Sequence, residues 1–122
     1  MTVDFLIIGQ GLAGTLLAYF LEQAGRRVHV VYQYDKRSAT QVAAGIINPI
    51  TGRRYVKSWR VDELIPFAKE TYLALELKLG ISLYHERNIL RSLFNSREEN
   101  DWMARTGEEE YSPYMLEEAT LE

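Results

Sequence analysis

Apolar residues in the first third of the chain fall into three groups whose spacing predicts a strand, a helix and a second strand. The apolar run from Phe5 to Ile8 predicts a buried strand over residues 3–8. A helix is expected over residues 12–24, with Gly25 just past its end, because apolar side chains recur there at helical spacing, at Leu16, Leu17, Phe20, Leu21 and Ala24. A valine-rich run predicts a second buried strand over residues 27–33.

Downstream of these elements the pattern becomes less regular. Up to residue 47 we expect a loop with a short helix at most, followed by a polar turn over residues 48–54. A long helix is expected over residues 62–79, with Asp62 as N-cap and Gly80 as its end. Its apolar stripe consists of Leu64, Ala68, Tyr72, Leu75 and Leu79.

The last third of the chain predicts two short strands and a final helix. Apolar runs over 81–86 and 89–94 are expected to pair as an antiparallel hairpin through residues 85–88. A helix is expected to start near Ser96, with acidic residues in its first turn. Only two parallel strands precede this part, whereas a doubly wound sheet needs more. The chain therefore reads as the front part of a larger α/β protein.

Three glycines between the first strand and the first helix are the most informative feature. Gly9, Gly11 and Gly14 have the G-x-G-x-x-G spacing of dinucleotide-binding turns. The first permits a tight turn, the second admits a pyrophosphate close to the backbone, and the third lets helix and strand pack closely. We expect phosphates to bind N–H groups at the helix N-terminus, with a βαβ unit that binds no nucleotide as the alternative. The candidate residues are Gly9, Gln10, Gly11, Leu12, Ala13 and Gly14.

Composition narrows the remaining chemistry. The chain has 122 residues, 47% of them hydrophobic and 25% charged, which suits one modest globular domain. With no cysteine and only two histidines, we expect neither disulfides nor a metal site. Apolar runs are too short to span a membrane and no signal peptide is visible, so a cytoplasmic location is expected. The final Leu121-Glu122 is interpreted equally well as native sequence or as a cloning scar.

Charge is distributed unevenly along the chain. Residues 1–97 carry thirteen basic and eight acidic side chains, whereas residues 98–122 carry one arginine and nine acids. The acidic tail is expected to be solvated or to fold back on a basic stretch formed by Arg53, Arg54, Lys57 and Arg60. That stretch could instead meet a substrate carboxylate or RNA. Trp59 within it is expected to anchor a loop, with stacking on a base or on a cofactor ring as the alternative.

A second motif follows the second predicted strand, and with the glycine turn it resembles the start of D-amino-acid-oxidase-type (glycine oxidase-like) FAD-dependent oxidoreductases. The segment Ala39 to Pro49 is similar to the stretch that runs along the flavin side of FAD in that family. Thr40 stands where the family has serine, and its hydroxyl is expected to bond a phosphate oxygen. The resemblance places small or apolar residues beside the cofactor at Ala43, Ala44, Gly45 and Ile46.

One residue departs from the dinucleotide-binding pattern. An acidic side chain is expected at the end of the second strand to bind the ribose hydroxyls, and this chain has Tyr32 there. A phenol cannot bind two hydroxyls bidentately, so Tyr32 either faces the ribose weakly or simply packs at the strand end. Asp35 lies three residues further on.

The resemblance implies a fold and a reaction. Residues 1–80 would form the N-terminal part of a Rossmann-like FAD-binding domain, and residues 81–122 would begin an antiparallel substrate domain. The whole protein would bind FAD non-covalently and oxidise a C–N bond of an amino acid or amine by hydride transfer to the flavin. The alternatives are the flavin domain of a tRNA wobble-uridine modification oxidoreductase and a non-catalytic nucleotide-binding fragment. No residue of the chain stands out as a catalytic acid, base or nucleophile, and whether the chain alone is an enzyme stays open.

The expected partners follow from the same reasoning. For the whole protein, the expected partner is a small-molecule amine or amino acid. No membrane partner is expected, and nucleic acid is the less favoured alternative. The chain by itself is expected to self-associate, because two parallel strands and an unpartnered hairpin leave strand edges and apolar faces open.

Overall fold

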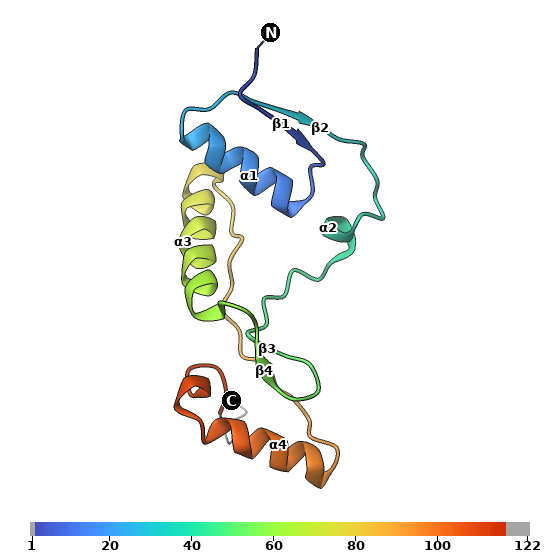
Figure 1. Ribbon diagram of the computed structural model, residues 1–122, viewed down its shortest axis with the longest axis vertical. Helices are drawn as coiled ribbons and strands as arrows, with labels where there is room; N and C mark the ends of the chain where they lie inside the picture. The colour runs from blue at the N-terminus through green and yellow to red at the C-terminus, as the bar shows by residue number, and fades with distance from the viewer. Residues whose placement is uncertain (1, 117–122) are drawn as a thin grey trace. The chain divides into compact units, whose positions relative to one another are not determined.

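The computed structural model describes residues 2–116 and consists of short strands and helices in two compact units, which divide between Ile46 and Ile47. The prediction made for Leu121-Glu122 lies outside the described residues. Along the chain the elements are β1 (Phe5–Ile8), α1 (Leu12–Gln23), β2 (Val28–Val31), α2 (Ala39–Val42), β3 (Ile50–Thr51), β4 (Val56–Lys57), α3 (Val61–Leu79), α4 (Ser96–Thr106) and a 3-10 turn, η1 (Glu109–Tyr111) (Figure 1). This mixture of helices and strands is compatible with the predicted α/β class.

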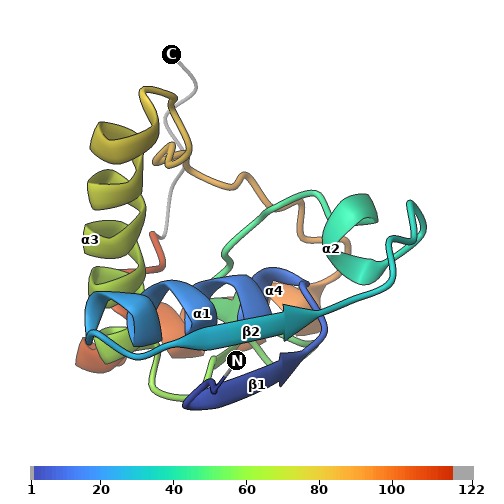
Figure 2. The ribbon, with the colours of Figure 1, turned by 90° about the horizontal axis from the view of Figure 1, so that it is seen from above.

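The first unit is built on a parallel β1–α1–β2 arrangement, as the sequence predicts. The two strands pair in register from Phe5 opposite Val28 to Ile8 opposite Val31. Helix α1 lies along the strand pair (Figure 2). It ends where expected, because Gly25 adopts a left-handed φ of +72° directly after the last turn. A strand, helix and parallel strand of this kind bring the β1–α1 turn to the carboxyl end of the sheet, where ligands bind in such folds.

Both strands retain apolar surface that the described residues do not cover. Ile7 is the buried residue of β1, whereas Leu6 and Ile8 are 59% and 84% exposed. Val31 of β2 is 48% exposed. Strands of parallel sheets are normally covered on both faces, so these side chains are expected to need further structure. Self-association of the chain stays a prediction.

The second unit begins with a small hairpin where only a polar turn was expected. Strands β3 and β4 are antiparallel, with Ile50 opposite Lys57 and Thr51 opposite Val56. The turn is tight because Gly52 has a left-handed φ of +73°. It carries Tyr55 into the core of this unit, where the ring meets Trp102 edge-on at 5.2 Å. The other core residues are Ile50, Leu93, Tyr111, Tyr114 and Met115.

Helix α3 confirms the predicted long helix, but its start differs in detail. It ends at Gly80, which has a φ of +68°, as predicted. The predicted N-cap at Asp62 is wrong, because Arg60 holds that position and Asp62 lies in the first turn. The Asp62 carboxylate instead accepts hydrogen bonds from Lys57 Nζ at 2.6 Å and from the Tyr114 hydroxyl at 2.7 Å. Side chains outside α3 therefore bond to the carboxylate that was expected to cap the helix.

The predicted antiparallel hairpin over residues 81–94 is wrong, because that segment contains no strand. It runs back along α3 as extended chain (Figure 1). The Glu76 carboxylate accepts hydrogen bonds from the N–H groups of Leu83 at 2.6 Å and Tyr84 at 2.9 Å. These bonds to the Tyr84 and Leu83 amides lower the pKa of Glu76. The backbone N–H groups that a strand would use for pairing are therefore bonded to a side chain of α3.

The final helix α4 starts at Ser96 as predicted, and Asn95 is its N-cap residue. Asn95 Oδ1 accepts a hydrogen bond from the Glu98 N–H at 3.0 Å. None of the helices in the described part of the chain is long and apolar enough to cross a membrane. The functional division into residues 1–80 and 81–122 stays a prediction, separate from the structural division at Ile46.

Candidate functional site: the glycine turn and its threonine

The glycine turn between β1 and α1 has the close packing that its spacing predicts. Gly9 adopts a φ of +105° and its N–H donates to the Val31 carbonyl at 2.8 Å, which joins the turn to the end of β2. A Cβ on Gly14 would lie 2.1 Å from the Gly9 carbonyl oxygen and 3.5 Å from Ile7 Cγ2. No side chain fits at the first of these distances, so only glycine lets α1 approach the strand here.

The N-terminus of α1 presents unused hydrogen-bond donors. Among the described residues, the N–H groups of Ala13 and Gly14 have no acceptor, whereas that of Thr15 donates to the Gly11 carbonyl at 2.9 Å. Gly11, the N-cap residue, has no side chain that could satisfy them. Free N–H groups at the positive end of a helix dipole are the usual binding site for a phosphate.

Thr40 joins the second motif to this turn. Its Oγ1 accepts a hydrogen bond from the Leu12 N–H at 3.0 Å, although the two residues are 28 positions apart. The same oxygen lies 3.1 Å from where a Cβ on Gly11 would be, so a side chain at this position would crowd Thr40. Because this oxygen acts as acceptor toward Leu12, the hydroxyl proton stays available to donate to a ligand.

The segment after α2 is open, as a cofactor-binding stretch would need to be. Residues 43–46 are exposed and Gly45 has a left-handed φ of +70°. Tyr32 directly follows the last residue of β2 and is 56% exposed, which is the position the sequence predicts for it. Asp35 bonds to the N–H of Arg37 at 2.9 Å and forms an ion pair with its side chain.

The basic stretch of the second unit is divided between different interactions. Lys57 is 15% exposed and bonds to Asp62 and, at 3.2 Å, to the carbonyl of Glu110, so the acidic tail does fold back on this lysine. The bond to Asp62 raises the pKa of Lys57, and the bond to Lys57 lowers the pKa of Asp62. The bond to Asp62 also raises the pKa of Tyr114 to about 12. This network is structural, since it ties β4, α3 and the tail together.

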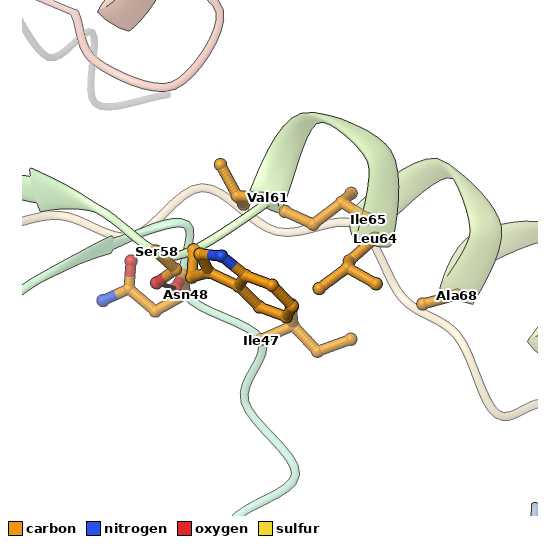
Figure 3. A pocket seen from close by; sticks show the side chains of 8 residues that line it. Ile47, Asn48, Ser58, Val61, Leu64, Ile65 and Ala68 are labelled. Atoms are coloured by element: carbon orange, nitrogen blue, oxygen red, sulfur yellow. Dashed lines mark hydrogen bonds between the residues drawn. The ribbon is translucent and has the colours of Figure 1, made fainter.

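A small apolar cavity lies beside the start of α3 (Figure 3). Its volume is about 280 Å³. The prediction that Trp59 anchors the loop is wrong, because Trp59 is 78% exposed, with the Arg60 guanidinium 5.3 Å from the centre of its ring. The lining suits an apolar group and consists of Ile47, Asn48, Ser58, Trp59, Val61, Leu64, Ile65 and Ala68.

These features fit the pyrophosphate of a dinucleotide. The turn has an enforced glycine at Gly14, two free N–H donors and a threonine hydroxyl within one small region. Among the described residues, no three His, Cys, Asp or Glu side chains gather as a metal site would require. Comparison with known proteins gives the same result as the geometry. The model of the FAD-dependent oxidoreductase family matches residues 4–122.

The chain belongs to the FAD-dependent oxidoreductase family. The resemblance noted from the two motifs is thereby confirmed, and FAD is the cofactor of this family. The bifunctional protein ThiO/ThiG of a Nostoc species is 31% identical over 99% of this chain and 19% of its own length. The uncharacterized oxidoreductase YurR of Bacillus subtilis is 36% identical over 46% of this chain and 15% of its own length.

A third relative differs in the reaction that its name gives. Squalene monooxygenase 1,1 of Brassica napus is 27% identical over 81% of this chain and 18% of its own length. The chain therefore spans less than a fifth of the curated relatives it matches. No solved structure matches it. Membership in this family implies FAD as the cofactor and an oxidoreductase reaction. It does not identify the substrate.

Proposed function

We propose that this chain provides the pyrophosphate-binding turn of an FAD-dependent enzyme. Residues 9–14 would hold the two phosphates, with the Ala13 and Gly14 N–H groups as donors. Thr40 would add a side-chain donor, and residues 43–46 would lie along the ribityl chain. The observation that carries this proposal is the contact between Thr40 and Leu12, because it brings both sequence motifs to one helix N-terminus.

Tyr32 is proposed to face the adenosine ribose. Its position directly after β2 supports this, because in dinucleotide-binding folds the strand end faces the ribose. A phenol can make one hydrogen bond to a hydroxyl where a carboxylate would make two. The pyrophosphate contacts would therefore supply most of the affinity.

We propose further that the whole protein oxidises a C–N bond of an amino acid or amine. FAD accepts the hydride in such reactions, so the protein must bind and orient both partners rather than provide a nucleophile. The resemblance to the D-amino-acid-oxidase type supports this substrate class. Residues 1–80 would belong to the FAD-binding domain, and residues 81–122 would begin the substrate domain.

The reaction can be tested with the protein in its full native length and loaded with FAD. Amino acids and amines are mixed with it in the absence of oxygen, and the visible absorbance of the flavin is followed. Bleaching by one of these compounds supports the proposal. If amines leave the flavin oxidised while a modified tRNA reduces it, the tRNA-modification alternative holds instead.

A further inference from the structure

Four arginines of the second unit line one cavity, which we call the arginine cavity. Its volume is about 540 Å³, larger than the apolar cavity beside α3. Arg53 and Arg54 come from the β3–β4 turn, Arg91 from the extended segment after α3, and Arg97 from the first turn of α4. The remaining lining residues are Asn95, Glu98 and Asp101.

The backbone and one guanidinium of this cavity are held in place by the core. The Arg91 guanidinium lies 4.7 Å from the centre of the Tyr55 ring, and Tyr55 is 1% exposed. Arg105 Nε donates to the Arg54 carbonyl at 3.4 Å, which ties the β3–β4 turn to α4. The Asn95 side-chain oxygen accepts from Glu98, so its NH₂ group can donate into the cavity.

The charges in the arginine cavity are not neutralised by carboxylates of the described residues. None of its four arginines forms an ion pair with a carboxylate among residues 2–116. Glu98 uses its carboxylate to accept from the Phe94 N–H at 3.1 Å. Four positive and two negative side chains leave a net charge of +2 on the lining. Like charges held together in this way repel one another, and a bound anion would remove that repulsion.

We infer that the arginine cavity binds the doubly charged terminal phosphate group of a small ligand, separate from the FAD pyrophosphate. A guanidinium group can donate two parallel hydrogen bonds to the oxygens of a phosphate. Four guanidinium groups offer more donors than a single carboxylate of a ligand could accept. A terminal phosphate carries close to two negative charges at neutral pH, which matches the net charge of the lining. A nucleic-acid backbone carries only one negative charge per phosphate, so it matches the net charge of the lining less well.

The test is a calorimetric titration with inorganic phosphate. It uses the protein in its full native length, saturated with FAD so that the glycine turn is occupied. Saturable binding is expected, and the double variant Arg53→Gln/Arg97→Gln should weaken it at least about tenfold, because two charge-assisted contacts are lost. Asp101→Asn should tighten binding, because it raises the net charge of the lining.

Arg87→Gln is the matched control. Arg87 lies on the same extended segment as Arg91, is exposed, and lines no part of the cavity. Unchanged binding is expected for this variant. Absence of saturable phosphate binding, or equal weakening by the control and the double variant, would overturn the inference. Displacement of phosphate by an oligonucleotide without terminal phosphates would overturn the assignment to a small ligand.

Discussion

Replacing Thr40 by valine removes one hydroxyl group from the junction of the two motifs while keeping the shape of the side chain. In the structure this hydroxyl accepts from the Leu12 N–H at 3.0 Å and has its proton free. If the proton goes to a phosphate oxygen of FAD, the variant loses a hydrogen bond to a charged group. Such bonds contribute about 1.5–3 kcal/mol, equivalent to a loss in affinity of about 10- to 100-fold.

The expected loss lies at the lower end of this range. Without the Thr40 hydroxyl, the Leu12 N–H has no acceptor among the described residues and can itself donate to the phosphate. This new contact offsets part of the loss, so we expect FAD to bind about tenfold more weakly. The free energy of unfolding should fall by only about 0.5–1.5 kcal/mol, because the exposed Leu12 N–H can bond to water.

Fluorescence titration with FAD measures the affinity, and Thr40→Ser is the matched control. Serine keeps the hydroxyl and should bind FAD nearly as tightly as the native chain, since only a methyl group is removed. Equal affinity of the valine variant and the native chain would refute the role of the hydroxyl. Equal weakening by serine and valine would show that the methyl group matters instead.

Three further substitutions test other parts of the account. Gly14→Ala should destabilise the first unit by more than about 1–3 kcal/mol in thermal unfolding, because its Cβ would lie 2.1 Å from a carbonyl oxygen. Gly107→Ala is the control and should not destabilise the protein, because its Cβ would meet nothing closer than 3.7 Å. Tyr32→Glu should tighten FAD binding about tenfold in calorimetry, because a carboxylate can accept from both ribose hydroxyls; no gain would contradict the proposed position of the ribose. Tyr114 has its pKa raised from 10.0 to about 12 by Asp62, so its contribution to stability is present below pH 10 and lost as the pH rises toward 12. In urea unfolding, Tyr114→Phe should be less stable than the native chain below pH 10 and lose less stability above it; an identical alkaline decline would contradict this.

Local patterns predicted the first unit well, because its elements depend on residues close together in the chain. The glycine spacing, the apolar run of β1 and the stop at Gly25 are each set within a few positions. The same holds for the end of α3 at Gly80. The direct contact between Thr40 and Leu12 spans 28 residues, and no local pattern encodes it.

Errors occurred where distant side chains compete for a local group. Asp62 was expected to cap α3, but Tyr114, 52 residues away, bonds to its carboxylate. The hairpin over 81–94 was expected from two short apolar runs, but the Glu76 carboxylate accepts hydrogen bonds from two of its N–H groups. The arginine cavity likewise combines three segments, so only Arg53 and Arg54 could be recognised in advance as neighbours.

Amide resonances of the glycine turn test the central claim most directly. Isotope-labelled protein is titrated with FAD and its amide resonances are followed by nuclear magnetic resonance. The account predicts large shifts for Ala13 and Gly14, whose N–H groups have no acceptor among residues 2–116, and small shifts for Ala104 and Gly107 in the other unit. FAD binding that leaves the Ala13 and Gly14 amides unshifted would contradict the assignment of this turn to the pyrophosphate.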